Sequence, residues 1–141
     1  MRLDLLVNDF TYRAINEKSI VLFESYFKRN FIHVRDVADV FSLAIEHSDK
    51  FVDNIFNVGL SDANLSKYEL CILIKKFLPF FEIYKSESGK DPDQRNYIVL
   101  NKKIEDRGFK PKISLENGIK ELIEGLKIFN TKLYTNINWK L

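Results

Sequence analysis

Histidine and cysteine, two side chains often used in acid–base and nucleophilic catalysis, are scarce in this sequence. The histidines are His33 and His47, and the single cysteine is Cys71. An imidazole titrates near neutral pH, so His33 is a candidate acid or base, with a structural role at a turn as the alternative. Cys71 lies in the apolar stretch 70–74, where a thiol is expected to pack as a small hydrophobic side chain. No catalytic residue is assigned from these groups.

Several other classes of protein are disfavoured by composition. One cysteine excludes an internal disulfide and a multi-cysteine zinc site, and two histidines are too few for a histidine-rich metal site. The 22 basic and 20 acidic residues are interspersed, whereas a nucleic-acid-binding protein shows a clustered basic face. The sequence has no apolar run long enough for a membrane helix, and its start does not resemble a signal peptide. We therefore expect no nucleic-acid or membrane partner, no metal, and a cytoplasmic location.

The spacing of apolar residues predicts alternating helices and strands within one domain, because 141 residues is a typical domain length. Helices are expected over residues 3–17, 35–47, 66–78 and 101–107, and from 114 onward. Extended segments are expected at residues 19–24, 30–34, 54–59, 81–85 and 97–100. This alternation predicts an α/β fold, in which 54–59 is the one segment with the character of a buried parallel strand. Residues 130–141 are expected to form a tail that docks through Tyr134 and Trp139.

Capping signals mark the ends of several predicted helices. Ser66 and Glu69 have the spacing of a capping box, in which each side chain satisfies a free backbone N–H. Asp36 is expected to cap the helix that follows it, and Ser114 to cap the last helix. Gly108 is expected to end the short helix before it.

Seven short motifs follow one another along nearly the whole chain. They are Arg-x-Asp-Leu-x-Val-Asn (2–8), Arg-x-Phe-Ile-His-Val-x-Asp-Val-Ala (29–38), Ile-Phe-Asn-Val-Gly (55–59), Asn-x-Ser (64–66), Asp-x-x-x-Arg-x-Tyr (91–97), Lys-Ile-x-x-x-Gly-Phe-x-Pro (103–111) and Ser-Leu-Glu-x-Gly-Ile (114–119). In this order they resemble the extended short-chain dehydrogenase/reductase family, specifically its sugar-nucleotide epimerases and dehydratases. Each motif alone has little specificity, and the ordered set carries the resemblance.

The resemblance implies a partial Rossmann-type fold in residues 1–141: one late parallel strand plus a small α/β substrate-binding subdomain. In complete relatives an amino-terminal half binds NAD(P) and carries a Gly-x-x-Gly-x-x-Gly turn and a catalytic Tyr-x-x-x-Lys pair. The five glycines here form no such turn, and none of the six tyrosines has a lysine four positions later. The resemblance therefore implies the carboxyl-terminal, substrate-side half, which is expected neither to bind NAD(P) nor to catalyse alone.

The same resemblance assigns a set of residues to the nucleotide-sugar substrate. The planar guanidinium of arginine pairs well with phosphate oxygens, and Arg29 and Arg95 match the arginines that hold the substrate diphosphate in relatives. Asn8 matches an asparagine that offers its amide to the diphosphate. Lys90 stands near a position where many relatives carry another arginine.

Each assignment has a structural alternative. Arg29 and Asn8 are alternatively surface residues, and Arg95 is alternatively paired with Asp91 or Asp93 in its own loop. Relatives often carry a glycine-rich hairpin before the first arginine, whereas residues 23–28 contain no glycine. The motifs do not determine which sugar or nucleotide is bound.

Three interpretations of the whole chain stay open. It is a fragment of an ordinary epimerase or dehydratase, with Met1 an internal methionine of a longer reading frame. Alternatively, it is a natural short protein that works as a binding module, docked on a full-length homologue or paired with a separate Rossmann-half chain in a split enzyme. The third is a degenerate remnant, which should expose apolar surface and aggregate.

Overall fold

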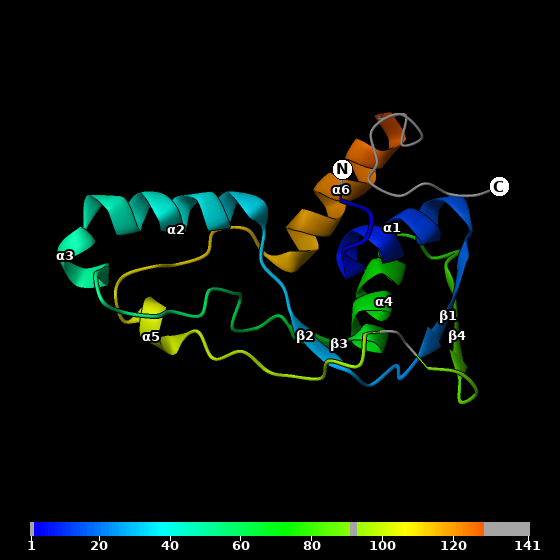
Figure 1. Cartoon of the computed structure of the whole chain (residues 1–141). Helices are drawn as coiled ribbons and strands as arrows, with labels where there is room; N and C mark the ends of the chain where they lie inside the picture. Colours follow the sequence, from blue (N-terminus) through cyan, green and yellow to red (C-terminus); the bar gives the residue numbers. More distant parts are fainter. Residues whose placement is uncertain (1, 91–92, 129–141) are drawn as a thin grey trace.

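The computed structural model describes residues 2–90 and 93–128, which alternate between helices and short strands (Figure 1). The predicted docking of Tyr134 and Trp139 lies outside the described residues. In chain order the elements are α1 (Leu6–Asn16), β1 (Ser19–Phe23), β2 (Lys28–Asn30), α2 (Val34–Glu46), α3 (Ser48–Phe51), β3 (Asn64–Ser66), α4 (Lys67–Lys75), β4 (Glu82–Ser86), α5 (Lys102–Glu105) and α6 (Leu115–Ile128).

The strands form two separate two-stranded sheets. β1 pairs with β4 in parallel, from Ser19 opposite Glu82 to Phe23 opposite Ser86. β2 pairs with β3 in antiparallel fashion, with Arg29 opposite Leu65. The predicted α/β class is thus confirmed.

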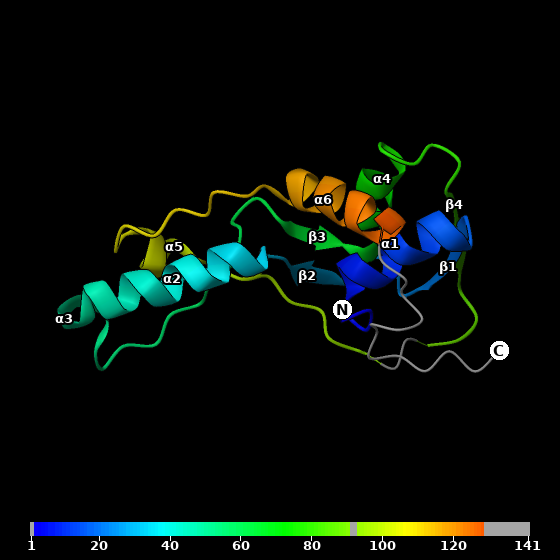
Figure 2. The same cartoon turned by 90° about the horizontal axis from the view of Figure 1, so that it is seen from above.

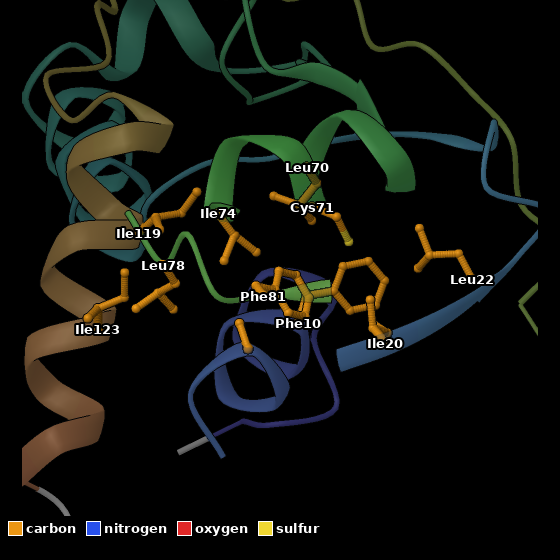
Figure 3. Packing of buried hydrophobic residues seen from close by; sticks show 11 residues of the cluster. Phe10, Ile20, Leu22, Leu70, Cys71, Ile74, Leu78, Phe81, Ile119 and Ile123 are labelled. Atoms are coloured by element: carbon orange, nitrogen blue, oxygen red, sulfur yellow. The ribbon is translucent and has the colours of Figure 1, made fainter. Parts of the chain in front are cut away.

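The main hydrophobic core lies where α1 contacts both α4 and α6 and where β1 and β4 close the opposite side (Figure 3). Its members come from α1, β1, α4, the segment between α4 and β4, and α6: Phe10, Ala14, Ile20, Leu22, Leu70, Cys71, Ile74, Leu78, Phe81, Ile119 and Ile123. Phe81 is fully buried at the start of the segment that becomes β4. Because a buried apolar side chain contributes roughly 1.5–3 kcal/mol, this cluster is the main stabilising feature of the fold.

A second, smaller cluster lies away from the main core, beneath α2. It consists of Val40, Ile104 and Phe109, which bring α2, α5 and the following loop together. In both views α2 extends from the body formed by α1, α4 and α6 (Figure 2). Much of α2 therefore faces away from any described part of the chain.

The predicted parallel strand at residues 54–59 was wrong. Residues 54–58 have no regular secondary structure, and Ile55 is 89% exposed. A strand is stable only where a neighbouring backbone completes its hydrogen bonds, and the described part of the chain offers this segment no such neighbour. The parallel pair forms instead between β1 and β4.

The capping predictions were partly correct. Ser66 and Glu69 form the capping box of α4, and Ser114 accepts a hydrogen bond from the backbone of Asn117 at 3.2 Å. The predicted cap at Asp36 was wrong, because α2 starts earlier and His33 is its N-cap, with Nδ1 accepting from the Arg35 N–H at 3.1 Å.

Asp36 has a different structural role. Its buried carboxylate accepts the backbone N–H groups of Lys112 and Ile113 at 2.8 and 3.2 Å, which ties α2 to the segment before α6. Several element boundaries also differ from prediction, for example those of one strand and one helix. The strand expected at 30–34 is β2, Lys28–Asn30, and the helix expected to reach 78 ends at Lys75.

Two neighbouring phenylalanines allow a matched test of the core. Phe81 is 0% exposed and Phe80 is 51% exposed. We expect Phe81→Ala to lower the free energy of unfolding by about 3–5 kcal/mol, because it leaves a cavity among packed side chains. Phe80→Ala should cost less than about 1 kcal/mol. Urea denaturation of both variants measures the difference, and equal losses would contradict the described core.

Candidate functional site

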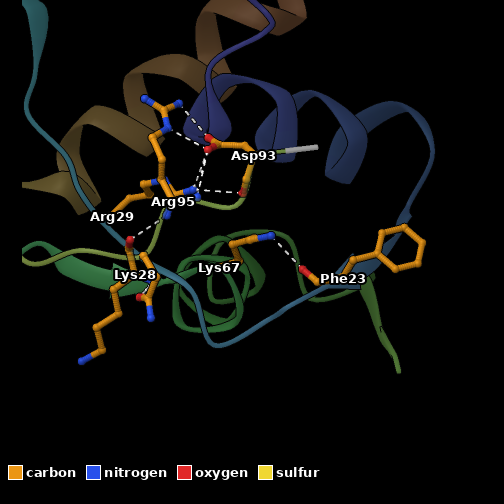
Figure 4. Close-up of polar contacts among 7 residues, drawn as sticks. Phe23, Lys28, Arg29, Lys67, Asp93 and Arg95 are labelled. Atoms are coloured by element: carbon orange, nitrogen blue, oxygen red, sulfur yellow. Dashed lines mark hydrogen bonds and ion pairs between the residues drawn. The ribbon is translucent and has the colours of Figure 1, made fainter. Parts of the chain in front are cut away.

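The two predicted substrate-binding arginines meet at one carboxylate. Arg29 lies in β2 and Arg95 lies in the segment that precedes α5, yet both contact Asp93 (Figure 4). Arg29 Nη2 is 3.1 Å from Asp93 Oδ1, and the Nε and Nη2 of Arg95 are each 2.7 Å from an oxygen of the same carboxylate. We call these three residues the arginine–aspartate cluster.

Arg29 is the buried member of the cluster. Its side chain is 5% exposed, so the alternative of a surface arginine was wrong. Nη1 donates to the carbonyl of Lys28 at 2.8 Å, Nη2 donates to the carbonyl of Asp93 at 3.3 Å, and the guanidinium lies 5.3 Å from the centre of the Tyr97 ring. Within the described residues, the buried Nε has no acceptor. An unpaired buried donor is unfavourable, which makes Arg29 Nε a notable feature of the site.

Arg95 is the exposed member. Its side chain is 71% exposed and forms a two-pronged contact with Asp93, which is one of the two ion pairs that the sequence offered as an alternative to ligand binding. The other alternative, Asp91, lies outside the described residues. The exposed guanidinium is attached to a loop, so it can reorient at lower cost than that of Arg29.

The electrostatics of the cluster favour an anion. The hydrogen bonds from Arg95, with a further contribution from Arg29, hold the pKa of the Asp93 carboxyl well below its usual range. The carboxylate therefore remains ionised at neutral pH. Two guanidinium groups beside one carboxylate leave the cluster with a net positive charge.

Backbone and amide contacts hold the loop of Arg95 against the strand of Arg29. The backbone N–H of Lys28 donates to Asn96 Oδ1 at 2.9 Å, and the N–H of Tyr97 donates to the Lys28 carbonyl at 3.3 Å. Asn64 in β3 accepts from the Val99 N–H at 2.9 Å and donates to the Val99 carbonyl at 3.1 Å. The antiparallel pair β2–β3 thus positions both arginines, although they lie far apart in the sequence.

The two other predicted substrate-binding residues are not part of this cluster. Asn8 is half-buried on α1, and its amide donates to the carbonyl of Arg2 at 2.7 Å. Lys90 is exposed after β4. Among the described contacts, neither residue touches the arginine–aspartate cluster.

Lys67 is a buried charge that the sequence reasoning missed. It is 2% exposed, and its ammonium donates to the Phe23 carbonyl at 2.7 Å and lies 5.4 Å from the centre of the Phe27 ring. A signal was present, because Lys67 is the first residue of α4, where the positive end of the helix dipole disfavours a cation.

A shallow hollow of about 220 Å³ lies beside Lys67, between α1 and β1. Its lining consists of Asp9, Phe10, Arg13, Ile20, Val21, Leu22, Phe23 and Lys67. Burial raises the pKa of the Asp9 carboxyl, and the hydrogen bond from Arg13 offsets part of this effect. The hollow is therefore lined by five apolar and three charged side chains, and it lies next to β1.

The remaining reactive groups do not form a second site. Burial raises the pKa of the Cys71 thiol to about 12, so this thiol is protonated and unreactive at neutral pH. His33 caps α2, and its Nε2 lies 3.8 Å from Glu121. Across residues 2–90 and 93–128, no three His, Cys, Asp or Glu side chains gather to hold a metal ion. In the same residues no helix is long and apolar enough to cross a membrane.

The titration of Asp93 tests the described cluster. We expect its carboxyl to protonate well below the usual aspartate pKa of about 3.9, because both arginines stabilise the charged form. A carboxyl whose folded pKa is depressed stabilises the protein above its unfolded pKa, and this contribution is lost as the pH falls through the folded value. Arg95→Met should move the Asp93 pKa toward the ordinary value, as measured by NMR of the side-chain carboxyl carbon.

Arg107 offers a matched control for this titration. It is exposed beyond α5, and Arg107→Met removes the same charge at a site outside the cluster. This variant should leave the Asp93 titration unchanged. A normal Asp93 pKa in the unmodified chain, or an equal shift in both variants, would show that the cluster does not form in solution.

The sequence of this chain matches a family model and is similar to a curated protein over most of its length. Residues 4–59 match the model of the NAD dependent epimerase/dehydratase family. An uncharacterized protein of Schizosaccharomyces pombe is 26% identical over 149 residues, which cover 87% of this chain and 39% of that protein.

Solved structures share the fold over most of the chain. A dTDP-glucose 4,6-dehydratase from Bacillus anthracis, in complex with NAD, superposes with a TM-score of 0.76 at 18% identity, over 95% of this chain and 42% of that one. A UDP-glucose 4-epimerase from Thermotoga maritima, with UDP-glucose, gives a TM-score of 0.71 at 24% identity, over 87% of this chain and 39% of that one.

The chain thus spans about two-fifths of the length of the proteins that it matches. The family match covers its first part, and the shared fold extends over most of the rest. Together they confirm the resemblance read from the motifs: the chain carries part of the extended short-chain dehydrogenase/reductase fold of the NAD-dependent sugar-nucleotide epimerases and dehydratases.

Proposed function

We propose that this chain provides the substrate-binding side of an NAD-dependent nucleotide-sugar epimerase or dehydratase, and that Arg29 and Arg95 hold the diphosphate of the nucleotide sugar. The observation that carries the proposal is the convergence of two guanidinium groups on one small anionic group. The contact between Arg29 and Asp93 spans 64 positions of sequence, so the fold and not local sequence brings the arginines together.

The chemistry of the cluster suits a phosphate. Carboxylate and phosphate oxygens present similar paired acceptors to the fork of a guanidinium group. The Asp93 carboxylate shows that both arginines reach one anion, and the buried Nε of Arg29 is a further donor without an acceptor among the described residues. A diphosphate offers more acceptor oxygens than one carboxylate, and more negative charge.

Two similar structures support this choice of ligand. The Thermotoga maritima epimerase was solved with UDP-glucose, which contains a diphosphate. The Bacillus anthracis dehydratase acts on dTDP-glucose, another diphosphate-linked sugar. Both likenesses lie below 25% identity, so residue roles in this chain rest on its own geometry.

In this proposal the chain contributes positioning and leaves redox chemistry to another unit. Its glycines form no Gly-x-x-Gly-x-x-Gly turn, so the residues present do not fit the pyrophosphate of NAD, and the Tyr-x-x-x-Lys pair does not occur. Ordering a substrate in front of a reactive group lowers the entropic part of the barrier, which is the contribution we assign to the arginines. Turnover by the isolated 141-residue chain would contradict this division of roles.

Ligand binding to arginine variants tests the diphosphate role. With UDP as the probe, we expect Arg95→Met to weaken binding roughly ten- to hundredfold, because a hydrogen bond to a charged group contributes about 1.5–3 kcal/mol. Arg29→Lys should also weaken binding, because an ammonium cannot form the same paired contacts. Isothermal titration calorimetry on the whole chain measures both effects.

The controls for this experiment separate binding from folding and from general charge. Arg107→Met removes a distant exposed guanidinium and should leave UDP affinity unchanged. Arg29 is buried, so thermal melting of Arg29→Lys is needed to show that the variant is folded at the temperature of the titration. Equal affinity of all four proteins for UDP would refute the diphosphate role.

We also propose that one exposed apolar surface of the chain packs against a dinucleotide-binding α/β unit, either within a longer polypeptide or in a separate chain. Val34, Phe41 and Ile45 recur at helical spacing on α2, and they are 74%, 66% and 77% exposed. Ile55 and Leu100, at 89% and 78% exposed, are further exposed apolar residues in loops. Val34, Phe41 and Ile45 are here called the open surface.

The choice of this partner rests on the length comparison. The matched proteins contain a further three-fifths of chain that has no counterpart here, and one of them was solved in complex with NAD. Exposed apolar side chains grouped on one helix face, as on α2, commonly mark an interaction site. A degenerate remnant would expose the same surface, but its arginine–aspartate cluster would not be expected to bind a diphosphate.

Substitution on α2 tests the open surface. We expect the double variant Phe41→Glu and Ile45→Glu to bind less of the apolar dye ANS and to self-associate less than the unmodified chain, because both changes add charge to exposed apolar positions. Phe80→Glu is the matched control, since Phe80 is exposed in the turn before β4, at 51%. Dye fluorescence and sedimentation velocity give the comparison. An equal effect of the control would show that the open surface has no special role.

A further inference from the structure

We propose that Asp93 is an internal competitor for the anion site, occupying both guanidinium groups until a ligand displaces it. This inference rests on the proposed diphosphate role of Arg29 and Arg95. It adds that the chain holds its own substitute for the ligand, so binding begins with an exchange of one anion for another.

The contacts of Asp93 place its carboxylate where a ligand anion would have to bind. Asp93 Oδ1 lies 2.7 Å from Arg95 Nε and 3.1 Å from Arg29 Nη2, and Oδ2 lies 2.7 Å from Arg95 Nη2. Nε and Nη2 form one edge of the Arg95 guanidinium, and an arginine uses such an edge for paired contacts with carboxylate or phosphate. The Asp93 side chain therefore fills this edge of Arg95 while it also contacts Arg29 (Figure 4).

The burial of the three residues indicates which parts can move. The Arg29 side chain is 5% exposed, whereas those of Asp93 and Arg95 are 35% and 71% exposed. The Asp93 carbonyl separately accepts from Arg29 Nη2 at 3.3 Å, so the backbone stays attached to Arg29 when the carboxylate turns away. Rotation of the Asp93 side chain, which also gives up the 3.2 Å hydrogen bond that Oδ1 accepts from the Arg95 backbone N–H, would then open the site.

Displacement by an anion fits the cluster better than release by protonation. Because the arginines depress the Asp93 pKa, the carboxylate stays charged across the neutral range and does not leave through a change in pH. A ligand must therefore compete with a charged internal group. The apparent association constant equals the intrinsic constant multiplied by the fraction of molecules in which the carboxylate has already moved away.

An alternative role for Asp93 makes the opposite prediction. If the carboxylate only orients Arg95 for the ligand, its loss would weaken binding. If it competes, its loss would strengthen binding. The sign of one affinity change therefore decides between positioning and competition.

The test uses Asp93→Asn in the full 141-residue chain, with inorganic pyrophosphate as the probe. The amide keeps the size of the side chain and removes its charge. We expect tighter pyrophosphate binding by calorimetry, roughly tenfold if the occupied state outweighs the open state by about ten to one. Asp106→Asn is the matched control, because this substitution removes an equal charge and a 2.7 Å ion pair with Lys102 at another site. This control should leave the affinity unchanged.

A second variant keeps the test specific to the cluster. In the double variant Asp93→Asn and Arg95→Met, the gain should disappear, because the released guanidinium is absent. Unchanged or weaker binding by Asp93→Asn, or an equal gain in Asp106→Asn, would overturn the competitor role.

The outcome also distinguishes this inference from the function on which it rests. If Arg95→Met weakens pyrophosphate binding while Asp93→Asn does not strengthen it, the diphosphate role stands and the competitor role fails. If pyrophosphate binds none of the variants and not the unmodified chain, both fail together. Circular dichroism of Asp93→Asn should match that of the unmodified chain, because the Asp93 side chain is partly exposed in a loop.

Discussion

The burial of apolar side chains between α1, α4 and α6 is the interaction on which the rest of the structure depends. Phe10, Leu70, Phe81 and Ile119 come from different segments of the chain and share one core. This core holds the parallel pair β1–β4 on one side and fixes the start of α4 beside β3. Because α4 follows β3 directly, the core also determines where β2, and with it Arg29, must lie.

The arginine–aspartate cluster is a local consequence of that arrangement. A buried guanidinium is tolerated only when charge and hydrogen bonds compensate for its removal from water. Arg29 obtains this compensation from Asp93 and from two backbone carbonyls, and its Nε still lacks an acceptor within the described part of the chain. The burial of Arg29 is thus largely compensated without a ligand, and in the proposed function its Nε is the further donor offered to a larger anion.

The chain matches only part of each similar structure, and this bears on both the site and the open surface. The chain spans about two-fifths of the proteins it resembles, and α2 projects from the main core with much of its apolar face exposed. Residues 54–58 have the composition of a buried strand but no neighbouring strand to complete their hydrogen bonds. Both features agree with a substrate-binding portion that works against another α/β unit.

The sequence by itself determined the α/β class, the resemblance to sugar-nucleotide epimerases and dehydratases, and the capping box at Ser66. It offered the pairing of Arg95 with an acid of its own loop only as an alternative to ligand binding. These depend on local spacing and on ordered motifs. Only the tertiary structure decided that Arg29 is buried, that it shares Asp93 with Arg95, that Asp36 ties α2 to residues 112–113, and that residues 54–58 are not a strand. The physical reason is that burial and strand pairing depend on which distant segments are available as neighbours, and a local pattern does not contain that information.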